Sequence, residues 1–161
     1  MQADEIYQEA VPFTIIKWIL AMEIATTIFF LCLFISQIPA GLSWLYLGMF
    51  LLFLVSTALI ANFIKLTISV TPESITVAYG RIKYSIPWSR IESAYLDKNL
   101  GIFYGGWGIR MAKVKGEWLL VYNVIGSPRV ILKLNGGRFG QFVFSTKHPD
   151  EVLNIVEQQI R

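Results

Sequence analysis

The sequence predicts a membrane-anchored α+β protein, in which a transmembrane helical hairpin precedes a small antiparallel β-barrel or sandwich that a C-terminal helix caps. Three observations predict it: two long apolar runs near the N-terminus, an alternation of period two after Lys65, and a final apolar stripe at helical spacing. The 161-residue chain is 55% hydrophobic, which is high for a soluble domain. We expect a segment over 1–17, the hairpin over 18–64 and the β domain over 65–161.

The hairpin is predicted from two apolar runs, 18–38 and 42–64. Each is close to the ~20 residues that cross a hydrocarbon core of ~30 Å. The first run contains one ionisable side chain, Glu23, and the second contains none. Pro39 and Gly41 lie between the runs and break the helix. Two antiparallel spans are therefore expected.

Glu23 is the candidate interaction residue of the hairpin, since an ionisable group inside a span is costly unless it has a partner. In an antiparallel hairpin, Thr57 and Asn62 lie at about its depth, so we expect a hydrogen bond to one of them. The helices are expected to approach through small residues spaced four apart: Ala21 and Ala25 on the first, Thr57 and Ala61 on the second. Alternatively, Glu23 snorkels to the interface, or points outward to another protein's helix.

The basic flanks predict the orientation. Lys17 precedes the first span and Lys65 follows the second, while the turn between them has no Lys or Arg. By the positive-inside rule, both termini of this multi-pass protein are expected in the cytoplasm, with the hairpin in the cytoplasmic (inner) membrane. A cleaved signal peptide is not expected, because the first residues are acidic rather than basic. Residues 1–17 are expected to form an interfacial segment with helical spacing or a frayed tail.

The β domain is predicted from short runs of alternating or apolar residues separated by turns. The expected strands are 66–71, 74–79, 82–86, 88–96, 109–114, 117–122, 129–134 and 139–145. A helix is expected to start at Pro149, with Val152, Val156 and Ile160 on its apolar face. We also expect His148, directly before it, to help cap this helix.

Several motifs in this region resemble a known family. They include Ile86-Pro87 followed by Ser89-Arg90-Ile91-Glu92-Ser93, and the run Gly105-Gly106-Trp107-Gly108-Ile109-Arg110. Together with the opening strand Leu66–Thr71 and its Pro72-Glu73 turn, they look like small bacterial two-span membrane proteins with a pleckstrin-homology-like domain. The resemblance implies a bent barrel of about seven strands with a C-terminal helix. It implies no catalytic residues.

Catalysis, cofactor binding and metal binding are poorly supported. The chain has one cysteine, Cys32, and one histidine, His148, so no zinc or haem ligand set is expected. The acidic residues of the β domain show no paired spacing for acid–base chemistry. We therefore expect neither an enzyme nor a cofactor. Nucleic-acid binding is not expected either, because the basic residues are dispersed.

Two other sets of residues are candidates for contacts. Phe103, Tyr104, Trp107 and Arg110 belong to a glycine-rich loop, which either packs on its own barrel or contacts a partner or the membrane interface. Residues 65–161 carry 13 of the 14 Lys and Arg residues and 7 of the 11 Asp and Glu residues, a net charge of +6. Arg81 and Lys83, at a predicted hairpin turn, are candidate ligands for anionic headgroups, or ordinary edge charges.

The functional hypothesis is a non-catalytic adaptor or accessory subunit that docks through its helical hairpin and β domain on a larger integral membrane complex. That complex could be respiratory, photosynthetic or transport-related. The alternative is a membrane-surface module that binds anionic lipid. Expected partners are other integral membrane proteins, membrane lipids and a second copy of the chain.

Overall fold

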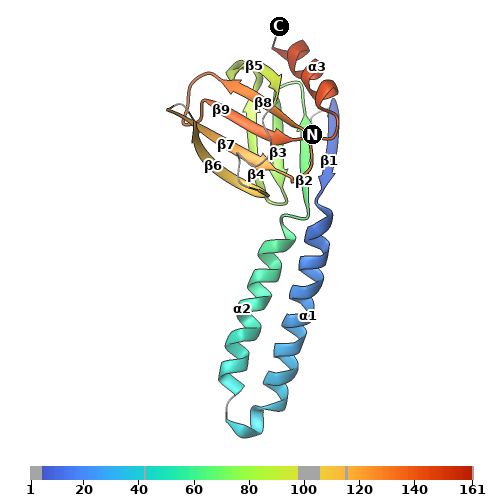
Figure 1. Ribbon diagram of the computed structural model, residues 1–161, viewed down its shortest axis with the longest axis vertical. Helices are drawn as coiled ribbons and strands as arrows, with labels where there is room; N and C mark the ends of the chain where they lie inside the picture. Colours follow the sequence, from blue (N-terminus) through green and yellow to red (C-terminus); the bar gives the residue numbers. More distant parts are fainter. Residues whose placement is uncertain (1–4, 42, 98–105, 115, 161) are drawn as a thin grey trace. The chain divides into compact units, whose positions relative to one another are not determined.

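The computed structural model describes residues 5–41, 43–97, 106–114 and 116–160. It divides the chain into two compact units (Figure 1). One unit is Phe13–Ile64, and the other combines Met1–Pro12 with Lys65–Arg161. The α+β layout predicted from the sequence is therefore present, but the second unit contains an N-terminal segment in addition to residues 65–161.

The helical unit consists of α1 (Thr14–Ser36) and α2 (Ser43–Ala61). A short 3₁₀ turn, η1 (Ile38–Ala40), follows α1, and Gly41 then adopts a φ of 73° that favours glycine. Both helices are long and apolar enough to cross a membrane. Compared with the predicted spans, α1 starts four residues earlier and ends two residues earlier, and α2 starts one residue later and ends three residues earlier.

Side chains at helical spacing form the contact between α1 and α2. On α1, Glu23, Phe30 and Phe34 are half-buried and Thr27 is buried. The rings of Phe30 and Phe53 stack with their centroids 5.3 Å apart. The predicted small-residue contact is wrong, because Ala21, Ala25 and Ala61 are all exposed. Aromatic rings and hydroxyls occupy the contact instead.

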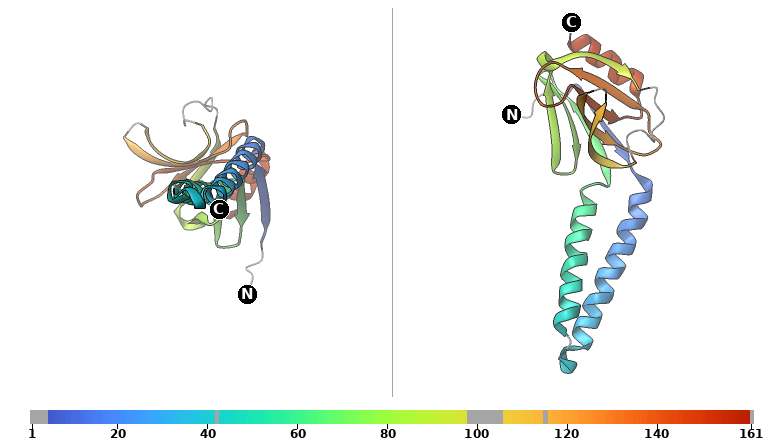
Figure 2. Two further views of the ribbon diagram at one scale, coloured as in Figure 1. Left: turned by 90° about the horizontal axis from the view of Figure 1, so that it is seen from below. Right: turned by 60° about the vertical axis from the view of Figure 1, so that its left-hand side comes forward.

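The β unit contains two sheets and one helix. Its strands are β1 (Tyr7–Pro12), β2 (Lys65–Val70), β3 (Ser74–Tyr79), β4 (Ile82–Pro87), β5 (Ile91–Leu96), β6 (Gly108–Val114), β7 (Glu117–Asn123), β8 (Arg129–Leu134) and β9 (Gln141–Ser145). The first sheet has the order β1-β2-β3-β4 and the second has the order β5-β8-β9-β7-β6. A 3₁₀ turn, η2 (Trp88–Arg90), leads into β5, and α3 (Pro149–Gln159) ends the described chain. The two sheets are visible in both views of Figure 2.

The N-terminal segment corrects the sequence interpretation. Residues 7–12 form neither a helix nor a frayed tail but the edge strand β1, which pairs antiparallel with β2 from Tyr7↔Val70 to Pro12↔Lys65. The inward side chains Glu9 and Val11 are buried, and the intervening residues are exposed. Burial in this segment therefore follows a strand's period of two, and Pro12 is tolerated because it ends an edge strand.

The second sheet is mixed rather than purely antiparallel. Strands β7 and β9 run parallel, with Leu119↔Gln141 and Tyr122↔Phe144 in register, whereas the remaining pairs in the sheet are antiparallel. Strand β9 lies between β8 and β7, so it faces strands on both sides and buries Phe142, Val143 and Phe144 in succession. Continuous apolar runs of this kind are typical of strands covered on both faces.

Aromatic side chains fill the space between the sheets. Tyr79 of β3 meets Tyr122 of β7 edge to face at 6.0 Å, and Tyr84 of β4 lies 5.2 Å from Phe142 of β9, measured between ring centroids. The hydroxyl of Tyr79 donates to the backbone oxygen of Asn123 at 2.7 Å. Burial raises the pKa of Tyr79 above its ordinary value. The two sheets therefore form one packed core.

Candidate functional site

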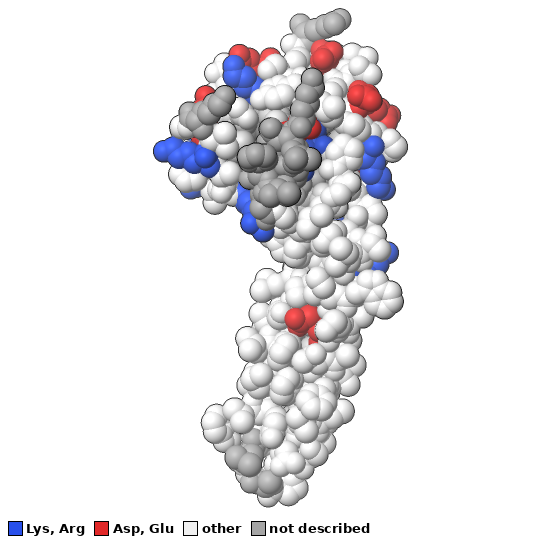
Figure 3. Space-filling model, in the orientation of Figure 1, with Lys and Arg blue, Asp and Glu red and all other residues white. Residues whose placement is uncertain are grey.

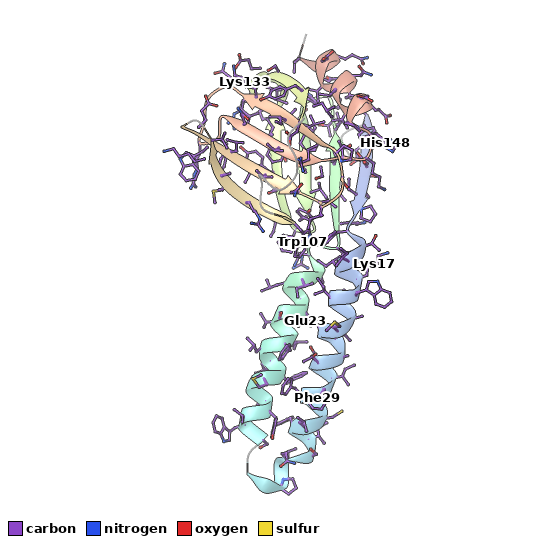
Figure 4. The ribbon with its side chains drawn as sticks, in the orientation of Figure 1. Lys17, Glu23, Phe29, Trp107, Lys133 and His148 are labelled. Atoms are coloured by element: carbon purple, nitrogen blue, oxygen red, sulfur yellow. The ribbon has the colours of Figure 1, made fainter. Side chains whose placement is uncertain are left out.

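Glu23 is the polar residue that stands out in the helical unit. It lies between Lys17 and Phe29 along α1 (Figure 4), and it interrupts a surface that is almost without charge on the face shown in Figure 3. Its Oε2 atom is buried without a hydrogen-bond partner among the described residues. The carboxyl group thus lies at the edge of the contact between α1 and α2, and its Oε2 accepts no hydrogen bond there.

The predicted hydrogen bond from Glu23 to Thr57 or Asn62 is not formed. The hydroxyl of Thr57 lies 3.3 Å from that of Thr27, and the Thr27 hydroxyl donates to the backbone oxygen of Glu23 at 2.8 Å. The Asn62 amide donates to the backbone oxygen of Ala58. These polar groups therefore lie at about the same depth as Glu23 without bonding to its carboxyl group. The Thr57 hydroxyl faces Thr27, and the Asn62 amide bonds within α2.

The glycine-rich loop is described only in part. Phe103 and Tyr104 lie outside the described residues. Trp107 is half-buried and Arg110 is exposed at the start of β6. The Asn123 amide donates to the backbone oxygen of Gly106, and Ser145 donates to the Asn123 carbonyl at 3.2 Å. A buried polar network therefore holds the end of the loop that leads into β6.

Arg81 and Lys83 lie at the β3–β4 hairpin, as predicted. The register Tyr79↔Ile82 makes Gly80-Arg81 the two-residue turn, and both basic side chains are exposed. Lys83 projects from the outward face of the sheet. Next to it on that face, Thr76 and Ser85 hydrogen-bond to each other at 2.8 Å. These positions are accessible to an anionic group.

Sequence reasoning missed a buried carboxylate, Glu9 of β1, which is 7% exposed. Its Oε2 accepts from the hydroxyl of Thr146 at 2.5 Å, and its Oε1 accepts from the backbone N–H of Lys147 at 2.6 Å. Tyr7 also donates to Oε2 at 3.0 Å, and burial together with this bond to Glu9 raises the pKa of Tyr7. Glu9 therefore fastens the N-terminal strand to the segment that precedes α3.

Two acidic residues that look isolated in the sequence also have partners. The side chain of Asp97 is fully buried, and its Oδ2 accepts a hydrogen bond from the Nε of Arg129 at 2.8 Å. Glu92 accepts from the exposed Lys133 at 2.9 Å, and this bond raises the pKa of Lys133. Both pairs join β5 or its end to β8, so they serve the fold rather than a reaction.

Metal binding and helix capping can be assessed for the described part of the chain. No group of three or more His, Cys, Asp and Glu side chains gathers there as a metal site would require. His148 occupies the position before α3, but its side chain makes no capping hydrogen bond (Figure 4). Its backbone N–H instead donates to the hydroxyl of Thr146 at 3.1 Å. His148 is therefore the N-cap residue of α3, as expected, but it caps the helix without a hydrogen bond from its imidazole.

No protein-family model, curated protein or solved structure matches this chain. We therefore infer its function from its residues and their geometry.

Proposed function

We propose that this protein is a non-catalytic, membrane-anchored accessory subunit whose helical hairpin docks beside the helices of other integral membrane proteins. The observation that carries the proposal is the half-buried side chain of Glu23, the one acidic residue of α1 and α2, whose Oε2 finds no donor among the described residues. A carboxyl group without a donor is costly in hydrocarbon. A neighbouring helix that offers Lys, Arg, Asn, Gln, Ser or Thr would donate to the accessible part of this carboxyl group.

The surface of both helices supports docking in a bilayer. Large apolar side chains such as Met22 and Phe29 are exposed on α1, as are Trp44 and Leu52 on α2. Lipid tails would solvate this surface, but they offer no donor to a carboxyl group. A protein partner supplies both the packing and the hydrogen bond.

The proposal includes the fold and placement of the β unit. We infer a pleckstrin-homology-like domain at the cytoplasmic face of a bacterial inner membrane, with both termini in the cytoplasm. The two packed sheets and the C-terminal helix support it, as do Lys17 and Lys65 on either side of the uncharged turn. Strand β1 and the parallel pair β7/β9 are additions to the simple antiparallel pattern implied by the resemblance.

The test is quantitative mass spectrometry of proteins that co-purify with the tagged full chain from gently solubilised native membranes. Wild type is expected to bring down a stoichiometric set of membrane proteins. The Glu23→Ala variant is expected to lose that set, while Ile28→Ala, on another face of α1, retains it. A wild-type chain that carries only lipids would refute the docking role.

The alternative is an anionic-lipid module that acts through Arg81 and Lys83. Their exposure on one turn supports it. The double variant Arg81→Glu/Lys83→Glu should then reduce the enrichment of anionic lipid around the reconstituted full chain. An unchanged lipid composition would remove this alternative.

A further inference from the structure

The far end of the β6–β7 hairpin exposes apolar side chains that the core does not use. Met111, Val114 and Trp118 are 56%, 46% and 43% exposed. In the same strand β7, Leu119 and Val121 are 2% and 1% exposed. Both Glu117 and Trp118 are exposed, whereas all residues from Leu119 to Asn123 are buried, so the packed core ends at Leu119 and the hairpin extends beyond it (Figure 2).

Two of these apolar side chains share one face with a cation. Lys113 is in register with Trp118, and its ammonium group lies 5.9 Å from the centroid of the indole ring. Met111 is two residues before Lys113 on the same strand, so its side chain points to the same side. An aromatic ring, a flexible apolar chain and a positive charge are thus presented together.

The composition of this end fits a lipid interface better than a protein interface. Trp and Lys both combine an apolar body with a polar or charged tip and are suited to the headgroup layer. A stable protein interface needs about 800 Å² from each partner, which three side chains at the end of a two-stranded hairpin do not supply. A bilayer accepts such a small wedge because it needs no matching surface.

The charge of the β unit selects the type of lipid. Residues 65–161 carry a net +6, and the three acidic residues of segment 1–12 reduce the net charge of the whole unit to +3. Lys and Arg side chains are spread over the unit (Figure 3). Each basic residue close to an anionic leaflet adds to the attraction, which salt then screens. The ammonium of Lys113 stands beside the exposed indole, where a lipid phosphate would meet it.

We propose that the end of the β6–β7 hairpin is a bilayer-contact site, in which Trp118, Met111 and Val114 enter the headgroup region of an anionic membrane and Lys113 binds lipid phosphate. The site goes beyond the docking role of Glu23, since it belongs to the other unit and takes lipid rather than protein. It also differs from the candidate headgroup ligands Arg81 and Lys83.

The experiment uses the full chain in vesicles, with Cys32→Ser to remove the native thiol. An environment-sensitive fluorophore is attached to Met111→Cys or, as a control, to Gln158→Cys on an exposed position of α3. The vesicles contain phosphatidylcholine with or without phosphatidylglycerol, and brominated acyl chains serve as the quencher. At position 111 we expect a blue shift and quenching that are larger in phosphatidylglycerol vesicles, with neither at position 158.

The substitution Lys113→Glu should reduce quenching at position 111, and raising the salt concentration should do the same. Lys113 is exposed, and an unchanged near-ultraviolet circular dichroism spectrum verifies the fold of this variant. If the Lys113→Glu variant misfolds, the difference in quenching between positions 111 and 158 in the chain with native Lys113 still tests the bilayer contact. Equal quenching at the two positions would overturn the proposal. So would protection of position 111 that grows with protein density, which would indicate contact between copies.

Discussion

The substitution Glu9→Ala should destabilise the β unit strongly, because one carboxylate holds β1 against the segment before α3. Its two shortest hydrogen bonds come from Thr146 at 2.5 Å and from the backbone N–H of Lys147 at 2.6 Å. Hydrogen bonds to a charged group contribute about 1.5–3 kcal/mol each, and a buried donor left without a partner adds a penalty of its own. Removing the carboxylate also removes its own desolvation cost. We therefore take the lower value, about 1.5 kcal/mol, for each of the two hydrogen bonds, and expect the free energy of unfolding to decrease by about 3 kcal/mol.

The assay is urea unfolding of the full chain in detergent at pH 7, followed by near-ultraviolet circular dichroism. A loss of about 3 kcal/mol corresponds to roughly a hundredfold change in the unfolding equilibrium. Hydrogen exchange gives a local readout, since the amide of Lys147 should lose protection more than other amides of the β unit. The Thr146→Val substitution should lower the free energy of unfolding by less than Glu9→Ala does. The double variant Glu9→Ala/Thr146→Val should show a coupling energy of about 1–2 kcal/mol between the two residues.

Glu5→Ala is the matched control. Glu5 precedes β1, carries the same charge and accepts a hydrogen bond from Ser69 at 2.8 Å, but the pair is exposed. Its removal should change stability by no more than about 0.5 kcal/mol. The reasoning is refuted if Glu9→Ala and Glu5→Ala have the same effect, or if Lys147 exchanges no faster in the Glu9 variant.

Two further predictions concern the β unit. Because Pro12 and Lys65 are register partners, replacing residues 13–64 by an Asn–Gly turn should give a soluble, folded unit with dispersed amide resonances. Residues 65–161 without β1 should aggregate, because the edge of β2 is then unpaired. A folded 65–161 fragment would contradict this prediction. Burial raises the pKa of Tyr79, so the unfolded chain ionises first and stability should fall as pH rises above about 10. Tyr79→Phe, which loses the bond to Asn123, should cost about 1 kcal/mol at pH 8. Its unfolding free energy should then decline less steeply above pH 10, and an unchanged alkaline slope would argue against the assignment.

Local patterns predicted much of the fold. The alternation in Leu66–Val70 and Ile75–Tyr79 identified β2 and β3, since each strand has one buried face. Length and composition identified the helical pair. The parallel arrangement of β7 and β9 was missed because it depends on β9 lying between strands distant in sequence. The apolar runs in β7 and β9 did carry a signal, that of strands covered on both faces.

The candidate site was predicted less well, for a physical reason. Glu23 is identifiable from sequence because any ionisable residue in an apolar run stands out. Its neighbours depend on which side of the helix faces α2, and at about 100° per residue Thr27 lies about 120° from Ala21 and about 160° from Ala25. Glu9 lies 137 residues from its partner Thr146. Burial alternates along β1, but the residues Tyr7–Pro12 do not alternate between apolar and polar, so the sequence carries no clear signal of this strand.

Site-specific photo-crosslinking in native membranes tests the central claim, docking at Glu23, most directly. A photoreactive residue replaces Met22, which is 72% exposed next to Glu23, or Ile28, which is 55% exposed. At about 100° per residue, Ile28 lies about 140° around α1 from Glu23. We predict a discrete adduct between position 22 and another membrane polypeptide, lost on Glu23→Ala, with lipid adducts only at position 28. Lipid adducts alone at both positions would contradict the docking role.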